Sequence, residues 1–240
     1  MNNQDQKPET MQQLPPLSPG EGSIAPKIYY EDENCTIYHG DCLEVIPSLA
    51  PVDLIATDSP YGINYFSNYY IGKNPHKIIE NDDSLFLPVE LLWDKIKETG
   101  AMFAFYSQKK PLDDYRKKNV IIWIKNNWTA GDLEGDFGNQ YECIAFMPKP
   151  NFKLKGKRLS NVWYCDRQKP DLHPTQKPIE IMAKIILCAT KAGESVLDPF
   201  MGSGTTLLAA KRLGRKAIGI EIDERYCEIS AKRLVQYELF

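Results

Sequence analysis

The sequence lacks the patterns that mark several common classes of protein. No apolar run approaches the roughly 20 residues needed to span a bilayer, and the amino terminus has no charged-then-apolar signal pattern, so we expect a cytoplasmic protein. The six cysteines form no Cys-x-x-Cys pair and the three histidines stand apart, so we expect no metal site and reduced, packed cysteines. The net charge of −3 argues against a protein that coats nucleic acid non-specifically.

The composition that remains is ordinary for a globular chain. With 240 residues, 42% of them hydrophobic and 25% charged, the sequence suits one α/β domain with a sizeable core. Residues 1–26 are rich in Gln, Pro, Ser and Gly, which predicts a disordered tail. We therefore expect a single folded domain over residues 27–240.

Apolar runs alternate with segments of helical spacing along that domain. This alternation predicts a doubly wound, mostly parallel sheet. Helices are expected near 43–49, over 87–100 with Gly100 as the C-cap, over 177–193 with Pro178 in the first turn, over 204–214, and from 223–224 onward. Strands are expected at 35–40, 52–57, 101–106, 120–125, 141–148, 195–200 and 216–222.

One of these strands runs straight into an unusual turn. In residues 53–62, Asp-Leu-Ile-Ala-Thr-Asp-Ser-Pro-Tyr-Gly, Asp58 falls where the strand should end. Pro60 fixes its own backbone and pushes Ser59 toward an extended conformation. The turn would hold a carboxylate, a row of backbone carbonyls and the ring of Tyr61 in one place. Alone, the same residues are equally typical of an Asx-type turn with Tyr61 capping the sheet.

A second turn of interest lies in residues 196–210, where a strand, an acidic residue, a Gly-Ser-Gly turn and a helix start follow one another. Such glycines let backbone approach a ligand, and the helix start supplies N–H groups. The third glycine of a dinucleotide site and the Gly-Lys-Ser/Thr of a P-loop are both missing. Asp198 ends one strand, and Glu221 ends the next, about 20 residues on, where α/β folds hold ribose hydroxyls. The pattern indicates a ligand with a ribose but no pyrophosphate.

Four motifs in this order resemble a known family. They are Gly-Asp-Cys at 40–42, Asp-Ser-Pro-Tyr-Gly at 58–62, His-Pro-Thr-Gln-Lys-Pro at 173–178, and Asp-Pro-Phe-Met-Gly-Ser-Gly-Thr-Thr at 198–206. From about residue 28 to 237 the chain resembles the amino-group DNA methyltransferases that use S-adenosylmethionine, in the β-type motif order. The resemblance implies a Rossmann-like methyltransferase fold with a circularly permuted motif order, cut between the strands at 217–222 and 35–41.

The resemblance also implies where S-adenosylmethionine binds. From the residues alone, His173 can equally brace a loop, Lys177 can be a solvated lysine, and Phe200 can belong to the core. By likeness to the family, the cofactor residues are Asp41 and Cys42 near the adenine, Glu221 at the ribose, Asp198, Phe200, Gly202, Ser203, Gly204, Thr205 and Thr206 in the loop, and His173, Thr175 and Lys177 over the methionine part.

The same likeness assigns the catalytic motif to Asp58, Ser59, Pro60 and Tyr61. An exocyclic amine on adenine or cytosine is a poor nucleophile, because its lone pair is delocalised into the ring. Acceptors around the amine, here Asp58 and the Ser59 carbonyl, would stabilise the charge that develops, while Tyr61 stacks on the base. The family has proline where this chain has Ser59, which costs rigidity and adds a hydroxyl. We expect N6-adenine methylation of DNA; the alternatives are N4-cytosine methylation, an RNA or single-stranded DNA substrate, and a non-catalytic regulatory subunit that binds S-adenosylmethionine.

The chain has few candidate residues for recognising a particular DNA sequence. Family members usually carry a sizeable recognition insert before the His-Pro-Thr-Gln-Lys-Pro segment, whereas here residues 164–173 leave room only for a loop. The remaining candidates are residues 62–84, residues 126–139 and the basic run 149–169, in which we expect Lys155, Lys157 and Arg158 to contact phosphates. The sequence thus predicts a short or relaxed recognition site, unless a homodimer or a partner subunit supplies more.

Overall fold

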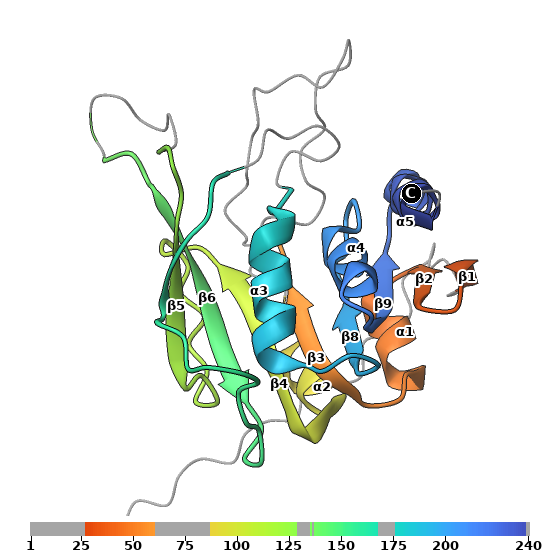
Figure 1. Ribbon diagram of the computed structural model, residues 1–240, viewed down its shortest axis with the longest axis horizontal. Helices are drawn as coiled ribbons and strands as arrows, with labels where there is room; N and C mark the ends of the chain where they lie inside the picture. Colours follow the sequence, from red (N-terminus) through yellow and green to blue (C-terminus); the bar gives the residue numbers. More distant parts are fainter. Residues whose placement is uncertain (1–26, 61–86, 129–134, 136, 168–175, 239–240) are drawn as a thin grey trace, which may run out of the picture.

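The computed structural model describes residues 27–60, 87–128, 135, 137–167 and 176–238 (Figure 1). The tail predicted for residues 1–26 lies outside this part. Within it, nine strands form one sheet in the order β1-β2-β9-β8-β3-β4-β6-β5-β7. The strands are β1 (Lys27–Glu31), β2 (Cys35–His39), β3 (Val52–Thr57), β4 (Ile96–Tyr106), β5 (Asn119–Ile124), β6 (Tyr141–Pro148), β7 (Val162–Tyr164), β8 (Ser195–Asp198) and β9 (Lys216–Glu221).

The middle of the sheet is parallel, as predicted. β2, β9, β8, β3 and β4 pair in parallel, and antiparallel pairing is confined to β1–β2, β4–β6 and β5–β6 among the described strands. β9 and β2 lie side by side although they come from opposite ends of the domain. This neighbourhood is what a circularly permuted Rossmann-like sheet requires, so the predicted fold class is confirmed.

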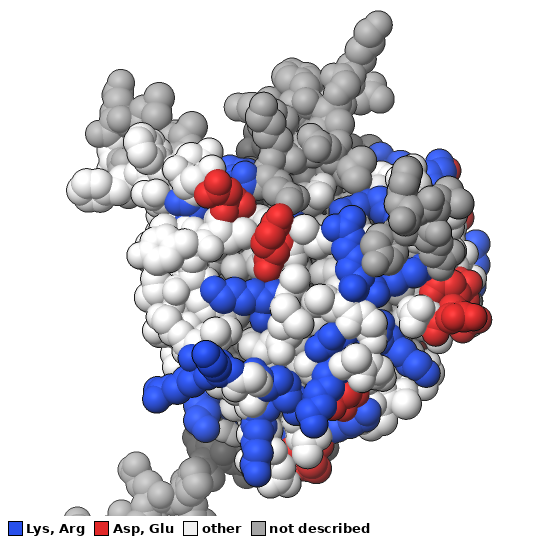
Figure 2. Space-filling model, viewed as in Figure 1, with Lys and Arg blue, Asp and Glu red and all other residues white. Residues whose placement is uncertain are grey.

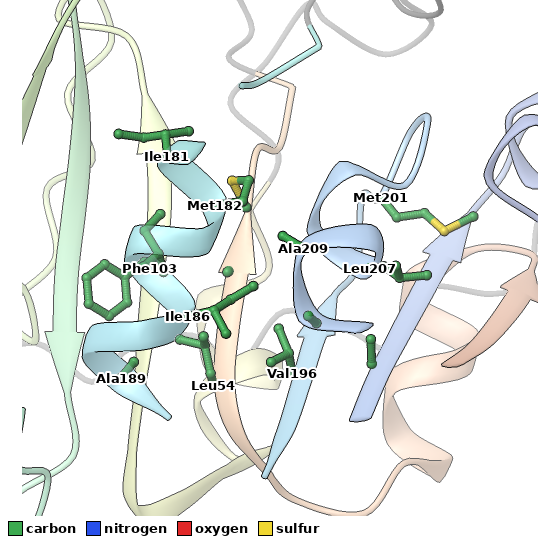
Figure 3. Packing of buried hydrophobic residues seen from close by; sticks show 14 of the residues in the cluster. Leu54, Phe103, Ile181, Met182, Ile186, Ala189, Val196, Met201, Leu207 and Ala209 are labelled. Atoms are coloured by element: carbon green, nitrogen blue, oxygen red, sulfur yellow. The ribbon is translucent and has the colours of Figure 1, made fainter. Parts of the chain in front are cut away.

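Helices cover both faces of the sheet. On one face lie α3 (Ile179–Ala189), α4 (Thr205–Arg212) and α5 (Glu224–Glu238), and on the other α1 (Cys42–Val45), the short 3₁₀ helix η1 (Ile46–Ser48) and α2 (Val89–Trp93). Successive residues of a strand contribute to the hydrophobic cores on opposite faces of the sheet. Leu54 of β3 packs in the core on the α3 face, whereas Ile55 packs in the core on the α1 face. Figure 3 shows Ile186 of α3 gathered with Leu54 and Val196 in the first layer.

The helix predicted over residues 87–100 is wrong in its second half. α2 ends at Trp93, and Ile96–Gly100 begin the long strand β4. Strand pairing overrides helical spacing here, because Ile96 pairs with Val52 and the Gly100 carbonyl accepts a 3.0 Å hydrogen bond from the Lys149 amide. Gly100 is not a C-cap. A Cβ at that position would lie 2.6 Å from the Asp53 carbonyl oxygen, so glycine permits the close approach of β3.

Smaller differences from prediction also have local causes. The helix expected near 43–49 divides into α1 and η1, with Pro47 inside the 3₁₀ segment, where proline cannot donate an α-helical hydrogen bond. The short edge strands β1 and β7 were not among the predicted strands. No helix in the described part of the chain is long and apolar enough to cross a membrane.

Candidate active site

Acidic side chains mark the carboxyl ends of four neighbouring strands. In the order of the sheet they are Asp41 just after β2, Glu221 at the end of β9, Asp198 at the end of β8, and Asp58 just after β3. The strands are parallel, so these ends meet at one edge of the sheet, where open α/β folds bind their ligands. Residues from opposite ends of the chain thus share one site.

The loop from β8 to α4 depends on its glycines. Gly202 and Gly204 have φ values of 51° and 75°, in the left-handed region that side chains disfavour. Helix α5 supports this loop from behind: Ser230 Oγ donates a 2.9 Å hydrogen bond to the Gly202 carbonyl, and Arg233 Nη1 donates to the Ser203 carbonyl. The loop therefore has a defined shape that two side chains from a distant helix help to hold.

Asp198 anchors the start of the same loop. Its carboxylate accepts hydrogen bonds from Thr206 Oγ1 at 2.5 Å and from the Phe200 amide at 3.1 Å. Burial raises the pKa of Asp198 to about 7, and the nearby charge of Asp58 adds to the rise. The carboxyl group thus braces the loop, and it lies close enough to Asp58 to interact with it electrostatically.

Glu221 joins the loop to the end of β9. Its two carboxylate oxygens accept hydrogen bonds from the Gly202 amide at 3.0 Å and the Asp223 amide at 2.9 Å. Burial raises its pKa. Asp41 caps α1, accepting a 2.8 Å hydrogen bond from the Leu43 amide. Both carboxylates are held in place by backbone, so they present oxygens at fixed positions.

Asp58 has a different environment, because a lysine reaches it. Lys177 Nζ lies 2.6 Å from Asp58 Oδ2 and 3.2 Å from Glu142 Oε2, and Glu142 Oε1 lies 2.6 Å from Lys125 Nζ. Burial opposes the charge on Lys177, yet the carboxylates of Asp58 and Glu142 raise its pKa overall. Burial likewise opposes the charge on Glu142, but the two ammonium groups hold its pKa at about 2. We call Asp58, Lys177, Glu142 and Lys125 the charge chain.

Comparison with known proteins agrees with this geometry. A family model described as "DNA methylase" matches residues 52–232. The chain belongs to this family. The methylase is 30% identical to the Type II methyltransferase M2.LlaDCHI of Lactococcus lactis subsp. cremoris over 89% of its own length and 94% of that protein. It is also 30% identical to the DNA adenine methyltransferase YhdJ of Escherichia coli (strain K12), over 85% of this chain and 84% of that one.

A solved structure shows the same architecture. The crystal structure of the M1.HpyAVI-SAM complex matches the methylase with a TM-score of 0.64 and 30% sequence identity, covering 83% of this chain and 99% of that one. The family resemblance in the sequence motifs is therefore confirmed at the level of both sequence and fold.

The methylase structure places the other predicted site residues as follows. Ser59 is buried, and its hydroxyl has no hydrogen-bond partner among the described residues. Cys42 is buried at the start of α1, where burial raises the pKa of its thiol to about 12, so it is unsuited to nucleophilic work. Phe200 is half-buried and packs against the core beneath α1, and Pro60 is half-buried. Tyr61, His173 and Thr175 lie outside the described residues.

Two parts of the charge chain were not among the predicted site residues. Glu142 and Lys125 belong to apolar strand segments, Tyr-Glu-Cys-Ile-Ala-Phe and Val-Ile-Ile-Trp-Ile-Lys, that were interpreted only as strands. A signal was present, since each segment carries one charged residue near the end that faces the site. Lys177 is not a solvated lysine, because its side chain is only 10% exposed.

The first part of the basic run, residues 149–158, lies away from the strand-end acids, whereas Arg167 returns to the carboxyl end of β5, where its amide donates a 3.2 Å hydrogen bond to Asn126 Oδ1. The amide of Lys149 donates a hydrogen bond to the carbonyl of Gly100 in the first half of β4. The amide of Lys155 donates one to the carbonyl of Cys188, at the carboxyl end of α3. Lys177 precedes the other end of that eleven-residue helix, about 16 Å away at 1.5 Å per residue. Lysine and arginine side chains are indeed frequent below α3 in Figure 2, but that end of the sheet is opposite the strand-end acids. Lys155, Lys157 and Arg158 are therefore poorly placed to hold DNA at Asp58.

Proposed function

We propose that this methylase transfers the methyl group of S-adenosylmethionine to the exocyclic N6 of adenine in DNA. One observation carries the proposal: Asp58 follows β3, directly beside β8, whose end begins the glycine loop. A methyl donor held at the loop and an amine held at Asp58 would therefore meet across two adjacent strand ends. Relatives of this chain named as adenine or Type II methyltransferases support the choice of reaction.

The donor set at the strand ends fits the cofactor. S-adenosylmethionine supplies a methyl group activated by a cationic sulfonium, and it also carries ribose hydroxyls and an adenine amine. Asp41, Asp198 and Glu221 form no ion pair with lysine or arginine in the described part of the chain, whereas Asp58 has Lys177. Acceptors without a cation suit hydroxyl, amine and sulfonium groups.

We propose the following division of labour within this site. Glu221 binds the ribose hydroxyls, and Asp41 with Cys42 lies along the adenine. Asp198 shapes the glycine loop through its bonds to Thr206 and the Phe200 amide. The loop residues Phe200, Gly202, Ser203, Gly204, Thr205 and Thr206 form the wall beside the cofactor, and His173, Thr175 and Lys177 approach from the segment before α3.

Methyl transfer then depends on acceptors placed around the target amine. Asp58 and the carbonyl of Ser59 accept its N–H hydrogen bonds, which favours a tetrahedral nitrogen with an available lone pair and stabilises the positive charge that develops. Tyr61 stacks on the base drawn out of the helix, a contact worth roughly 1–3 kcal/mol. The lone pair of the amine nitrogen would form the bond to the methyl carbon as the carbon–sulfur bond breaks, which leaves S-adenosylhomocysteine, and the methylated nitrogen would then release one proton to water. No cysteine is required as a nucleophile.

Two measurements test the proposed reaction. The purified full chain is incubated with methyl-labelled S-adenosylmethionine and duplex DNA, and the label transferred to DNA is measured. The DNA is then digested to nucleosides, and the methylated nucleoside is identified by mass spectrometry. N6-methyladenine is the expected product. Finding only N4-methylcytosine would overturn the target base, since the same acceptors suit that amine. Cofactor binding without any transfer would favour the regulatory-subunit alternative.

The recognition site and the cellular setting are proposals of the same kind. We propose a short or relaxed recognition sequence, because residues 149–167 contain only the short strand β7 and no recognition domain. A longer recognition sequence would need a second copy of the protein or a partner subunit. The molecular mass of the active species in solution shows whether either is present. Mapping methylated bases in DNA exposed to the chain alone tests the idea, and a long, strictly required motif contradicts it. DNA as the substrate supports a cytoplasmic location.

A further inference from the structure

We propose that Lys177, Glu142 and Lys125 are positioning residues for methyl transfer, which together fix the Asp58 carboxylate and set its charge. The inference rests on the proposed role of Asp58 as acceptor for the target amine. It adds three residues that do not themselves contact the base, two of which, Glu142 and Lys125, lie outside every motif of the family resemblance.

The geometry of the charge chain supports this role. Its members come from four separate elements: Asp58 follows β3, Lys177 precedes α3, Glu142 lies in β6 and Lys125 follows β5. Positive and negative charges alternate along it, with successive separations of 2.6, 3.2 and 2.6 Å. Lys177 therefore links the turn that holds Asp58 to the antiparallel part of the sheet, β4-β6-β5.

Burial makes the arrangement costly as a purely structural device. The side chains of Lys177 and Lys125 are 10% and 7% exposed, and those of Asp58 and Glu142 are 20% and 21% exposed. Removing such charges from water costs several kcal/mol per ion, and apolar residues of similar volume often stabilise a fold as well or better. Aromatic rings add to the positioning, because Lys177 Nζ lies 5.0 Å from the Phe105 ring centre and Lys125 Nζ 5.4 Å from that of Trp123.

The charge chain also influences whether the Asp58 carboxyl group is ionised. Lys177 favours the ionised carboxylate, which must accept hydrogen bonds from the amine, whereas Asp198 on the neighbouring strand end opposes ionisation. Glu142 shares the ammonium of Lys177, so it weakens that cation's hold on Asp58, and Lys125 keeps Glu142 ionised. Lys177 and Glu142 should therefore influence the ionisation of Asp58 in opposite directions.

This opposition yields a signature that a structural role would not produce. In Lys177→Met, kcat should fall about 10²-fold, the cost of a misplaced catalytic group, with KM for DNA within about twofold. The acidic limb of the kcat–pH profile should move to higher pH by about 1–3 units, because the cation next to the carboxylate is gone. In Glu142→Gln that limb should move to lower pH, and Lys177→Arg should restore part of the rate.

A matched control is available in the same chain. Lys211 Nζ lies 2.6 Å from Asp32 Oδ2, with side chains 4% and 14% exposed, in a pair remote from Asp58. Lys211→Met removes a buried ion pair of the same length, so it reports the loss of stability alone. Its kcat–pH profile should match that of the unaltered enzyme. Thermal unfolding of all variants identifies any that do not fold. If Lys177→Met does not fold, the kcat–pH profile of Lys177→Arg tests the inference in its place, because arginine keeps the positive charge.

The outcomes separate this inference from the proposed function. If Asp58→Asn retains normal turnover, Asp58 is not the acceptor and the proposed mechanism fails first. If Asp58→Asn is inactive while Lys177→Met and Glu142→Gln keep the unaltered pH profile, the charge chain is structural and only this inference is overturned. The inference would also be overturned if the acidic limb of the kcat–pH profile moved in the same direction in Lys177→Met and in Glu142→Gln.

Discussion

Ser230 Oγ in α5 donates a hydrogen bond of 2.9 Å to the carbonyl of Gly202, 28 residues earlier in the chain. The contact places a helix at the carboxyl end of the protein directly behind the proposed cofactor loop. Arg233, one turn further along α5, donates to the Ser203 carbonyl in the same loop. The shape of the loop is therefore set partly by residues outside its own motif.

Gly204→Ala tests this packing. A Cβ at residue 204 would lie 2.6 Å from Ser230 Oγ, and φ there is 75°, so the variant combines a steric clash with backbone strain. We expect weaker binding of S-adenosylmethionine in calorimetry and a loss of stability in urea unfolding. Gly193→Ala is the matched control, because φ is 81° but nothing lies within 4 Å of the added Cβ. Equal losses in both variants would show that strain alone, about 1–3 kcal/mol, accounts for the effect.

Asp58→Ala should abolish or nearly abolish methyl transfer while cofactor binding persists. Loss of one acceptor of developing charge costs roughly 10²–10³ in rate. Single-turnover transfer of labelled methyl to DNA measures the rate, and calorimetry measures cofactor binding. Near-normal turnover would rule out Asp58 as an essential acceptor.

Glu221→Ala should weaken binding of S-adenosylmethionine with the fold intact. The variant removes the proposed acceptor for the ribose hydroxyls and also the partner of the Gly202 amide. Calorimetry with S-adenosylmethionine and with methionine separates the two parts of the ligand, since methionine has no ribose. A similar loss of affinity for both ligands would mean that Glu221 acts only through the shape of the loop.

The raised pKa of Asp198 predicts a pH dependence of stability. Its pKa is about 7 in the folded protein, against an ordinary value of 3.8 for an aspartate side chain, so the folded state binds an extra proton between these two pH values. This contribution to stability is fully present below pH 3.8 and is lost as the pH rises through about 7. Urea unfolding across this range should show a smaller decline with pH for Asp198→Asn than for the unaltered protein; parallel curves would contradict the assignment.

Joint replacement of Lys155, Lys157 and Arg158 by glutamine should change DNA affinity and methylation rate by less than about twofold. These residues lie in the segment that docks on the far end of α3, opposite the strand-end acids. Binding is measured at several salt concentrations, because each lost phosphate contact lowers the salt dependence. A uniform loss of affinity across DNA sequences would show that the duplex reaches this surface after all.

Local patterns in the sequence determined most of the sheet and the ends of its strands. Apolar runs, glycine turns and strand-end acids act over a few residues, so Asp198 and Glu221 were predicted at the ends of their strands and are found there. The family motifs likewise pointed to the neighbourhood of β9 and β2, which the structure contains. The failed helix over residues 96–100 marks the limit, because pairing with β3 outweighed local helical spacing.

Only the tertiary structure decided which charges meet. Nothing in the spacing of the sequence relates Lys177 to Asp58, 119 residues away, or Glu142 to Lys125 across a hairpin. Their contacts follow from the order β3-β4-β6-β5 and the antiparallel direction of β6, which bring the start of β6 and the ends of β3 and β5 to one edge. The same direction carries Lys155 away from that edge. A charge run in a sequence reports its sign, whereas the path of the backbone determines where the charge acts.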